Sequence, residues 1–463
     1  MRPLDLAITE RPVFFTSQGD ERRNSGKDNG LTETHTESAA SIARMVEDAM
    51  STADPLGAAL RQTPRIVMLM ALTSCFALSQ AYRTVAALMA PQLQAEFGAT
   101  PQALGAFAGA FHFAFGAMQI FVGIGIDLRG IRRTVLAAFP LAVAGSLIAA
   151  FAHRFEWLVL GQALIGIGCA PAFLACTVFV ARRYPTERFA AISGLVLGLG
   201  GVGMLATGSP LAWLIDAASW RAGFGVLAAC SVAAWAAVWW WVADPAPEVS
   251  SVEKESIGTA MRRFGALFAL PHTAGIVALA AVTYASFITV RGLWLGPLLI
   301  ARHGFSLVEV GNVAFAISLM AMAGPALFGR LDPGPATRRR WLVAYTLACA
   351  ALLGLVASNL GATSDVGLFT LFGLLSGYMV LQYADVRAAY PASLTGRALS
   401  LFTMAMFLGV AAMQWFTGWV AALAPALGLD PFVATLVAIA ALLVAGAFAY
   451  MTLPAPLTSA GGS

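Results

Sequence analysis

The feature that most constrains this chain is a regular succession of twelve long apolar runs between residues 66 and 453. A run of about 20 residues, at ~1.5 Å per residue in a helix, crosses the ~30 Å hydrocarbon core of a bilayer. Lipid offers no partners to the backbone, so such runs must be helical. We therefore predict an all-α membrane protein whose twelve spans are 66–90, 103–126, 133–152, 157–181, 189–214, 221–243, 273–300, 307–329, 341–360, 366–385, 398–424 and 431–453.

Composition agrees with this class and argues against others. Hydrophobic residues make up 59% of the 463 residues and charged residues only 11%, against about 25% charged in soluble proteins. The net charge of +4 comes from basic residues in separated loops, so no nucleic-acid partner is expected. The five cysteines lie in apolar runs without ligand spacing, and no P-loop or nucleophile motif is present. We expect no enzyme activity, no cofactor, no metal site and no ATP-driven transport.

The apolar runs divide the chain into five parts. Residues 1–62 are polar and mixed in charge, and we expect a disordered cytoplasmic tail. Residues 63–243 hold the first six spans, 244–271 form a charged cytoplasmic linker, and 272–455 hold the last six spans. The end of the chain, 456–463, is expected to be a second disordered tail.

The distribution of basic residues predicts the orientation. If the N-terminus is cytoplasmic, the opposite loops hold only Arg154, Arg221 and Arg302. Cytoplasmic loops are enriched in Lys and Arg, which places both termini in the cytoplasm. On this orientation the cytoplasmic loops hold fifteen basic residues: Arg129, Arg132, Arg133, Arg182, Arg183, Arg188, Lys254, Arg262, Arg263, Arg330, Arg338, Arg339, Arg340, Arg387 and Arg397.

The two sets of six spans repeat. Several landmark residues recur at one offset, which indicates a duplicated half rather than chance. The pairs at an offset of 206 are Pro91 with Pro297, Gly98 with Gly304, Gly105 with Gly311, and Tyr184-Pro185 with Tyr390-Pro391, and Asp127 pairs with Asp332 at 205.

A short charged turn joins the second and third spans. Gly123 would let another backbone approach, and Asp127 can accept hydrogen bonds from a neighbouring helix N-terminus. The spacing G-x-x-x-D-x-x-G-x-R-R resembles the loop that holds the two halves of major facilitator superfamily carriers together and releases as access alternates. The residues of this expected gating motif are Gly123, Asp127, Arg129, Gly130, Arg132 and Arg133, with Asp332 in a degraded second copy. The alternative is an ordinary basic loop.

The resemblance implies two pseudo-symmetric six-helix bundles, with a solute site near the middle of the membrane between them. We accordingly expect a secondary transporter of the bacterial inner membrane that moves a small molecule by alternating access. No cofactor is expected beyond a coupling ion, either a proton or a counter-anion. The expected partners are the small-molecule substrate and the lipid bilayer, and we expect a monomer.

Two arginines lie deep in predicted spans, Arg83 and Arg291. A guanidinium at that depth costs at least ~2.5 kcal/mol and stays charged. Since no carboxylate is expected at mid-membrane, a bound anion is the economical partner. The pair resembles the two arginines that grip the substrate phosphate in the organophosphate/phosphate antiporters. The 206 offset, however, pairs Arg83 with Thr289 and not with Arg291. Arg291 therefore faces the same site as Arg83 only if the helix breaks near Gly292. The alternative is that each arginine binds backbone carbonyls at a bundle interface.

Further polar and aromatic side chains are suited to line a cavity. His112 is the histidine deepest in a span and could carry a proton near neutral pH, or it could be a hydrogen-bonded structural residue. For the others, packing between helices is the alternative. With the two arginines, the substrate-binding candidates are Tyr82, Trp294, His112, Gln119, Gln382 and Gln414.

Three functions remain open from the sequence. The first is transport of a small organic anion, with Arg83 and Arg291 holding its charge. The second is efflux of amphipathic, drug-like compounds by proton antiport, against which the two arginines and the missing mid-membrane carboxylate argue. The third is a membrane sensor that keeps the carrier fold without transporting, with residues 1–62 as its output segment.

Overall fold

The computed structural model describes residues 64–184, 186–243, 262, 265–391 and 394–454. The expected tail at 1–62, most of the expected linker at 244–271, and the end at 456–463 lie outside the described residues. Within the described ranges, twelve helical segments are long and apolar enough to cross a membrane. This confirms the predicted fold class of two pseudo-symmetric six-helix bundles.

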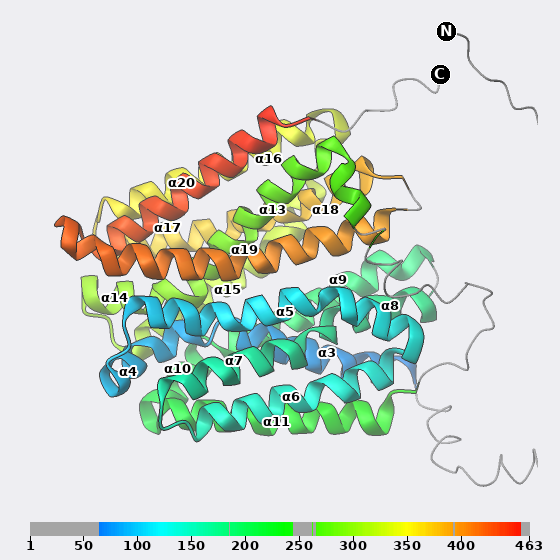
Figure 1. Cartoon of the computed structure of the whole chain (residues 1–463), viewed down its shortest axis with the longest axis horizontal. Coiled ribbons are helices and arrows are strands. Elements are labelled where there is room, and N and C mark those ends of the chain that lie inside the picture. Colours follow the sequence, from blue (N-terminus) through cyan, green and yellow to red (C-terminus); the bar gives the residue numbers. More distant parts are fainter. Residues whose placement is uncertain (1–63, 185, 244–261, 263–264, 392–393, 455–463) are drawn as a thin grey trace, which may run out of the picture. The chain divides into compact units, whose positions relative to one another are not determined.

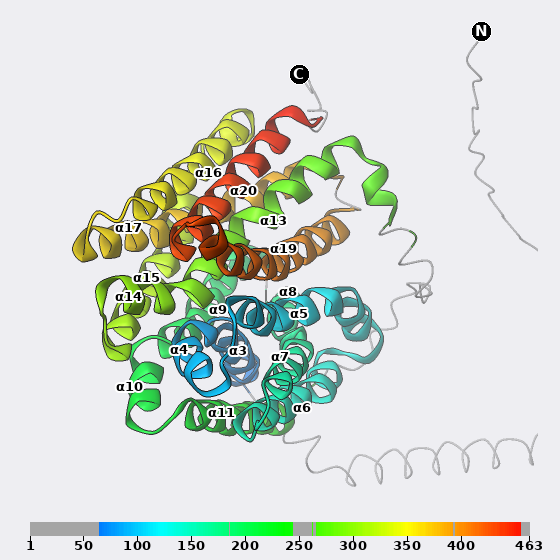
Figure 2. The same cartoon turned by 60° about the vertical axis from the view of Figure 1, so that its left-hand side comes forward.

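The first bundle holds six spans, several of them built from two helices (Figures 1 and 2). Its helices are α3 (Arg65–Tyr82), α4 (Ala86–Phe97), α5 (Pro101–Arg129), α6 (Ile131–Ala150), α7 (Phe155–Cys169), α8 (Pro171–Arg183), α9 (Thr186–Ala206), α10 (Ser209–Ala217) and α11 (Trp220–Trp241).

The second bundle repeats this pattern. Its elements are η1 (Ala266–Ala269), α13 (Pro271–Thr289), η2 (Val290–Trp294), α14 (Leu295–His303), α15 (Leu307–Arg330), α16 (Pro335–Ala357), α17 (Ala362–Leu375), η3 (Ser376–Tyr378), α18 (Met379–Ala389), α19 (Thr395–Leu423), η4 (Ala424–Leu427) and α20 (Pro431–Thr452).

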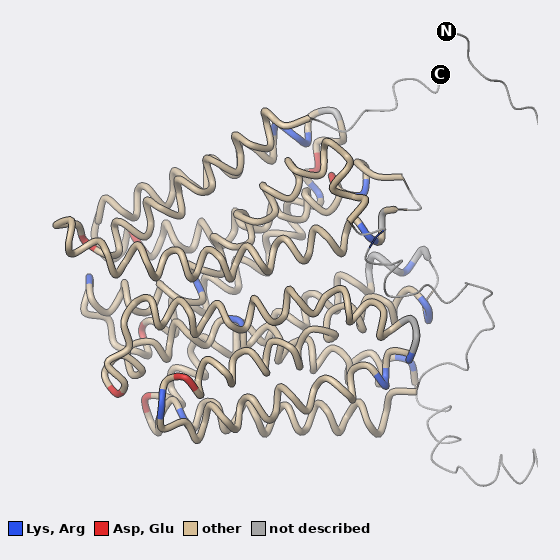
Figure 3. Tube along the Cα trace, in the orientation of Figure 1, with Lys and Arg blue, Asp and Glu red and all other residues tan. Residues whose placement is uncertain are grey.

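Charged residues gather at the two ends of the helices and leave the long middle stretches almost without charge (Figure 3). We call the end at which α3 begins and α20 ends the basic side, because the Arg-rich loops lie there, and the opposite end the far side. The expected orientation would make the basic side cytoplasmic.

Five spans are interrupted inside the membrane, where the sequence suggested continuous helices. The chain breaks between α3 and α4, between α7 and α8 at Pro171, and between α9 and α10 at Thr207 and Gly208. A π-helical segment, η2, interrupts the seventh span, and a 3₁₀ turn, η3, interrupts the tenth. Breaks of this kind release backbone carbonyls from the regular helical ladder, and these need other partners in lipid.

Small residues allow the helices to approach closely. A Cβ built on Gly203 in α9 would overlap the carbonyl oxygen of Ala77 in α3. Gly198, five residues earlier in α9, has no atom within 4 Å of such a Cβ. The glycine-rich fifth span therefore contains both a packing position and an open one, which sequence alone cannot tell apart.

The two bundles are joined from the far side to the middle of the helices. The backbone of α5 at Gly105 meets Gln414 of α19, and Gly116 meets Phe407. Ser209 donates a hydrogen bond of 2.6 Å to Asn312 across the bundles.

The gating-motif glycine of α5 lies outside this tight contact. About two turns beyond Gly116 toward the basic side, a Cβ added to Gly123 would have no atom of the described residues within 4 Å. The close backbone approach expected at Gly123 is thus wrong for this conformation, because α5 and α19 make their tight contact nearer the far side.

The two glycines of α9 give a matched test of packing. Gly203→Ala should destabilise the protein by about 1–3 kcal/mol, because the added methyl group meets backbone that cannot move freely. Gly198→Ala should be neutral or stabilise by up to ~1 kcal/mol, because alanine favours helix and the site is open. Thermal unfolding of the two purified variants in detergent measures this, and equal midpoints would contradict the assigned packing.

Candidate functional site

A cavity of about 110 Å³ lies between the two bundles, lined by residues of both. Its polar lining residues include Gln80, Arg83, Gln119 and Thr403. Aromatic rings make up much of the remaining wall: Phe76, Phe115 and Phe173 from the first bundle, and Tyr284, Tyr383 and Phe407 from the second. A mainly apolar cavity with a few convergent polar groups is the usual form of a small-molecule site.

Arg83 is the charged residue among those that line this cavity. It follows the last residue of α3, where the first span breaks, and is 6% exposed. Its guanidinium carbon lies 4.7 Å from the ring centre of Phe115 in α5 and 4.6 Å from that of Phe407 in α19. Each bundle therefore supplies one ring that faces the cation, a favourable cation–π arrangement.

The hydrogen-bond partners of Arg83 are all neutral. Nη1 donates to the Gln80 side-chain oxygen and to the Tyr284 hydroxyl, the latter over 3.2 Å. Nη2 donates to the Ser79 hydroxyl over 3.1 Å, and Nε is buried without a partner among the described residues. In the part of the chain that the structure describes, no carboxylate forms an ion pair with Arg83. Its positive charge faces the cavity uncompensated.

Arg291 lies in η2 and is almost completely buried, but it does not line this cavity. Its Nε donates to Ser318 over 3.1 Å, and Nη2 donates to the carbonyl oxygens of Met204 and Thr207 over 3.1 and 3.3 Å. The Met204 carbonyl lacks its usual helical donor, because Gly208 donates its N–H to Leu205 instead. Arg291 of the second bundle therefore caps the interrupted end of α9 in the first.

The interruption of the seventh span brings its backbone close to that of the first. A Cβ on Gly292 would lie 3.0 Å from the carbonyl oxygen of Arg83. The Thr84 and Thr207 hydroxyls are hydrogen-bonded at 2.6 Å at the same junction. For Arg291 to face the same way as Arg83, the sequence requires a helix break near Gly292. That break is present, but the Arg291 side chain contacts the backbone at the end of α9 and does not line the cavity.

Among the other candidates, Gln119 lines the cavity beside Arg83. Its amide nitrogen donates to the carbonyls of Phe115 and Ala170 over 3.2 and 3.4 Å. His112 is buried behind the cavity wall, with Nδ1 3.1 Å from the Ala108 carbonyl and Nε2 without a partner. Its ring stacks at 6.3 Å on Phe407, the residue that also faces Arg83.

Four further candidates do not line the cavity and are buried, three of them inside their own bundles and Gln414 where α19 meets Gly105 of α5. In the part of the chain that the structure describes, both amide atoms of Gln414 are buried without a hydrogen-bond partner. The other three pair with neighbouring hydroxyl groups: Tyr82 with Ser231 at 3.0 Å, Trp294 with Thr417 at 2.9 Å, and Gln382 with Thr283 at 3.2 Å.

The sequence did not single out the aromatic wall of the site. Phenylalanine in an apolar span looks the same whether it faces lipid, another helix or a cavity. One available signal was spacing, because Phe115 lies four residues before Gln119 and so shares its helix face. Tyr284 and Tyr383 carried no such signal, since their helices meet the first bundle only in the folded chain.

The charged turn after α5 lies at the basic side. Gly130 has a φ of 86° and separates α5 from α6, a conformation that glycine adopts readily. Arg129 and Arg133 are exposed, and the Asp127 side chain lies outside what the structure describes. Arg132 donates to the carbonyl of Trp239 over 2.9 Å within the first bundle.

The second copy of this motif is folded against its own bundle. Asp332 accepts two hydrogen bonds from Arg338, at 3.0 and 2.7 Å, and a third of 3.1 Å from the Gly334 N–H. These bonds, those of Arg338 above all, lower the pKa of the Asp332 carboxyl below its ordinary value.

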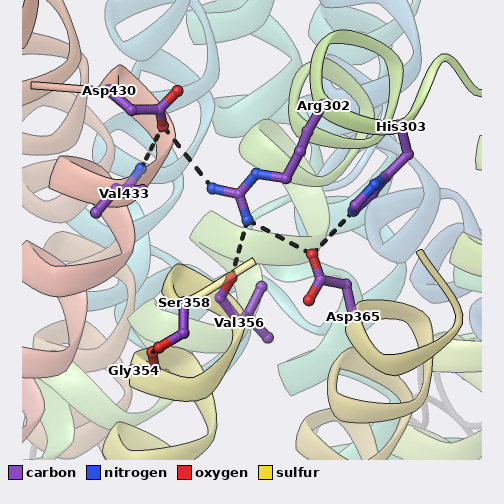
Figure 4. Close-up of polar contacts among 8 residues, drawn as sticks. All are labelled: Arg302, His303, Gly354, Val356, Ser358, Asp365, Asp430 and Val433. Atoms are coloured by element: carbon purple, nitrogen blue, oxygen red, sulfur yellow. Dashed lines mark hydrogen bonds and ion pairs between the residues drawn. The ribbon is translucent and has the colours of Figure 1, made fainter. Parts of the chain in front are cut away.

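A second cluster of charges lies at the far side of the second bundle (Figure 4). Asp365 is fully buried and lies 2.9 Å from His303 and 3.5 Å from Arg302. Arg302 also donates to the Val356 carbonyl over 2.8 Å and lies 3.8 Å from Asp430. These contacts tie α14, α17 and the start of α20 together within one bundle, so the cluster fixes structure rather than lining the cavity.

Comparison with known proteins gives one family match. Residues 72–414 match the family model described as Major Facilitator Superfamily.

The matching proteins include a "Probable sulfoacetate transporter" of Cupriavidus necator, 26% identical over 255 residues, which cover 52% of this chain and 59% of that protein. A mouse facilitated glucose transporter, solute carrier family 2 member 10, is 31% identical over 99 residues, 20% of this chain and 18% of that protein. A thioclapurine efflux transporter of Claviceps purpurea is 28% identical over 118 residues, 26% of this chain and 22% of that protein. The chain thus spans less than two thirds of each.

Solved structures with the same fold are more distant in sequence. A D-xylose-proton symporter has a TM-score of 0.67 and 12% identity, with 85% of this chain and 99% of that chain covered. A bacterial homologue of the human lysosomal transporter Spinster, inward-facing and occupied, has a TM-score of 0.65 and 18% identity, with 83% and 95% covered.

The contacts of Arg291 predict that it holds the far side closed. Arg291→Lys keeps a buried charge but loses the planar fork that reaches Ser318 and the α9 carbonyls. The closed arrangement should lose about 1.4 kcal/mol or more, a roughly tenfold change in the open-to-closed ratio.

In a chain without its native cysteines, cysteines replacing Ser209 and Asn312 can be joined by a short thiol cross-linker. The cross-link should form readily in the parent and less in the Arg291→Lys background. Arg154→Lys, at a residue whose side chain is 74% exposed, is the control. Equal yields in all three would contradict the closing role.

The Asp332–Arg338 pair predicts a pH-dependent contribution to stability. Because the folded pKa of Asp332 is lowered, its stabilisation is present above the ordinary Asp pKa of ~3.9 and is lost as the pH falls through the lower folded value. Asp332→Asn should lower the free energy of unfolding by about 1 kcal/mol at pH 7. The difference from wild type should shrink below about pH 4, whereas the exposed Asp216→Asn should show no such trend.

Proposed function

Because this chain belongs to the major facilitator superfamily, we propose that it is a secondary transporter that moves a small organic anion across the bacterial inner membrane by alternating access. The observation that carries the proposal is Arg83, a buried, permanently charged group that faces a cavity between the bundles without an acidic partner among the described residues. A bound carboxylate or sulfonate supplies the missing negative charge.

The position of Arg83 suits alternating access. Its cation is held between a ring of each bundle and bonded to Tyr284 of the second bundle. An anion bound there interacts with both halves and can influence how they move relative to each other. In the conformation described, the far half is joined through α5 with α19 and through Arg291 with α9, so exchange of the solute takes place from the basic side.

The basic side is assigned to the cytoplasm, since cytoplasmic loops carry the excess of Arg and Lys. Both chain termini are then cytoplasmic. The similarity to a protein named as a probable sulfoacetate transporter supports an organic anion as the cargo. A proton or a counter-anion is the coupling ion, and the transporter acts as a monomer.

Efflux of amphipathic compounds is the second candidate. The aromatic wall of the cavity and the similarity to a fungal efflux transporter favour it. The positive charge of Arg83, which has no acidic partner among the described residues, repels a cationic drug. This favours transport of an organic anion over efflux of such compounds. A drug-susceptibility panel on an overexpressing strain separates the two candidates, because efflux predicts broadly raised resistance.

The proposal is tested by replacing the arginine. Arg83→Ala should reduce uptake of an organic anion into proteoliposomes by roughly thirtyfold or more, because the anion loses its buried charge partner. Arg83→Lys should retain part of the activity, since it keeps the charge but not the planar fork. Arg154→Ala, at an exposed arginine on the far side, should transport normally. Unchanged anion affinity in a correctly inserted Arg83→Ala protein would contradict the proposal.

A further inference from the structure

The cavity between the bundles offers a single positive charge. Of its thirteen lining residues, Arg83 alone is charged at neutral pH. The remaining polar groups are the amides of Gln80 and Gln119 and the hydroxyls of Thr403 and two tyrosines. These can accept or donate hydrogen bonds, but none compensates a second negative charge.

The other buried arginine cannot supply that second charge. Arg291 is 1% exposed and does not line the cavity. Its Nε is bonded to Ser318, and its Nη2 is bonded to the carbonyls of Met204 and Thr207. Moving it toward the cavity would take this donor from the Thr207 carbonyl inside the membrane, which is costly, while the Met204 carbonyl would keep the Thr207 hydroxyl as a donor.

The donors near Arg83 suit one oxyanion group. A guanidinium has five N–H groups, and Arg83 uses three of them, toward Gln80, Tyr284 and Ser79. No described residue accepts a hydrogen bond from the Nε–H. Because Tyr284 accepts from Arg83, its own O–H remains available to donate. Guanidinium and phenol together can bind one carboxylate or sulfonate.

The rest of the wall suits a flat apolar body. The rings of Phe115 and Phe407 flank the guanidinium at 4.7 and 4.6 Å. Met379 and Met406 add flexible, polarisable contacts beside Tyr383. Aromatic rings pack well against such walls in stacked or edge-to-face arrangements, whereas a second ionic group would lose its hydration there without a partner.

We infer that this cavity selects organic anions with one negative charge on a flat, apolar body, and that it discriminates against dianions. This inference rests on the proposed function and narrows its substrate class. It differs from the two-arginine site that the sequence suggested, because Arg83 lines the cavity and Arg291 does not.

Binding to the purified full-length wild-type chain in lipid nanodiscs tests the inference. The probes are benzoate, its neutral isostere benzamide, and the dianion phthalate, with sulfoacetate and inorganic phosphate as non-aromatic anions. Benzoate should bind most tightly. Benzamide should bind at least about tenfold more weakly because it lacks the charge, and phthalate at least about tenfold more weakly because its second carboxylate is unpaired.

A variant can change the preference. Gln119→Arg places a second cation on the cavity wall, one helical turn from Phe115. The ratio of phthalate to benzoate affinity should then rise by about tenfold or more, and Gln119→Leu, which adds no charge, should leave that ratio low. Thermal unfolding confirms that each variant is folded, and the wild-type probe series decides the question if a variant is not.

Two results would overturn the inference, and they are distinguishable. If phthalate or sulfoacetate, which are dianions at neutral pH, binds wild type as tightly as benzoate, selection for a single charge is wrong. If phosphate does, selection for an apolar body is wrong. In either case transport of an anion stands. If no anion binds better than benzamide, the inference and the proposed function both fall.

Discussion

A guanidinium inside a membrane cannot lose its proton and must find partners there, and this constraint governs the interior of the protein. The two buried arginines satisfy this requirement in different ways. Arg291 is bonded to neutral oxygens of the protein, including carbonyls of α9. Arg83 is held between two phenylalanine rings with neutral hydrogen-bond partners and faces a cavity. One arginine joins the bundles, and the other leaves a charge for a ligand.

The interrupted helices make this division possible. Where α9 ends, Gly208 donates its N–H to Leu205, and the Met204 carbonyl accepts from Arg291 and from the Thr207 hydroxyl. Where α3 ends, the chain turns at Arg83, and the Thr84 hydroxyl reaches Thr207 of the fifth span. Breaks in the first, fifth and seventh spans therefore meet near one junction. Polar backbone becomes available in the middle of the membrane, and side chains from the same region satisfy it.

The candidate site could be predicted only in part. Arg83 and Gln119 stood out because polar side chains are costly in an apolar span, and both line the cavity. The same reasoning selected Arg291, which donates to the Ser318 hydroxyl and to carbonyls of the fifth span instead of lining the cavity. Phe115, Phe407 and Tyr284 were missed, because aromatic residues are favourable in any apolar span and nothing in the sequence marks those that face a cavity. The expected gating turn remains a prediction, since the Asp127 side chain lies outside the described residues.

The sequence by itself determined the twelve spans, their helical form and the duplicated halves, because lipid requires long apolar segments with internally bonded backbone and the landmarks recur at a fixed offset. Tertiary structure alone decided which polar groups face the cavity and which face the protein. That choice depends on helix breaks at Arg83, Gly208 and η2 and on the close approach of α5 to α19. These are contacts between segments far apart in the chain, and no local pattern specifies which face of a helix meets its partner.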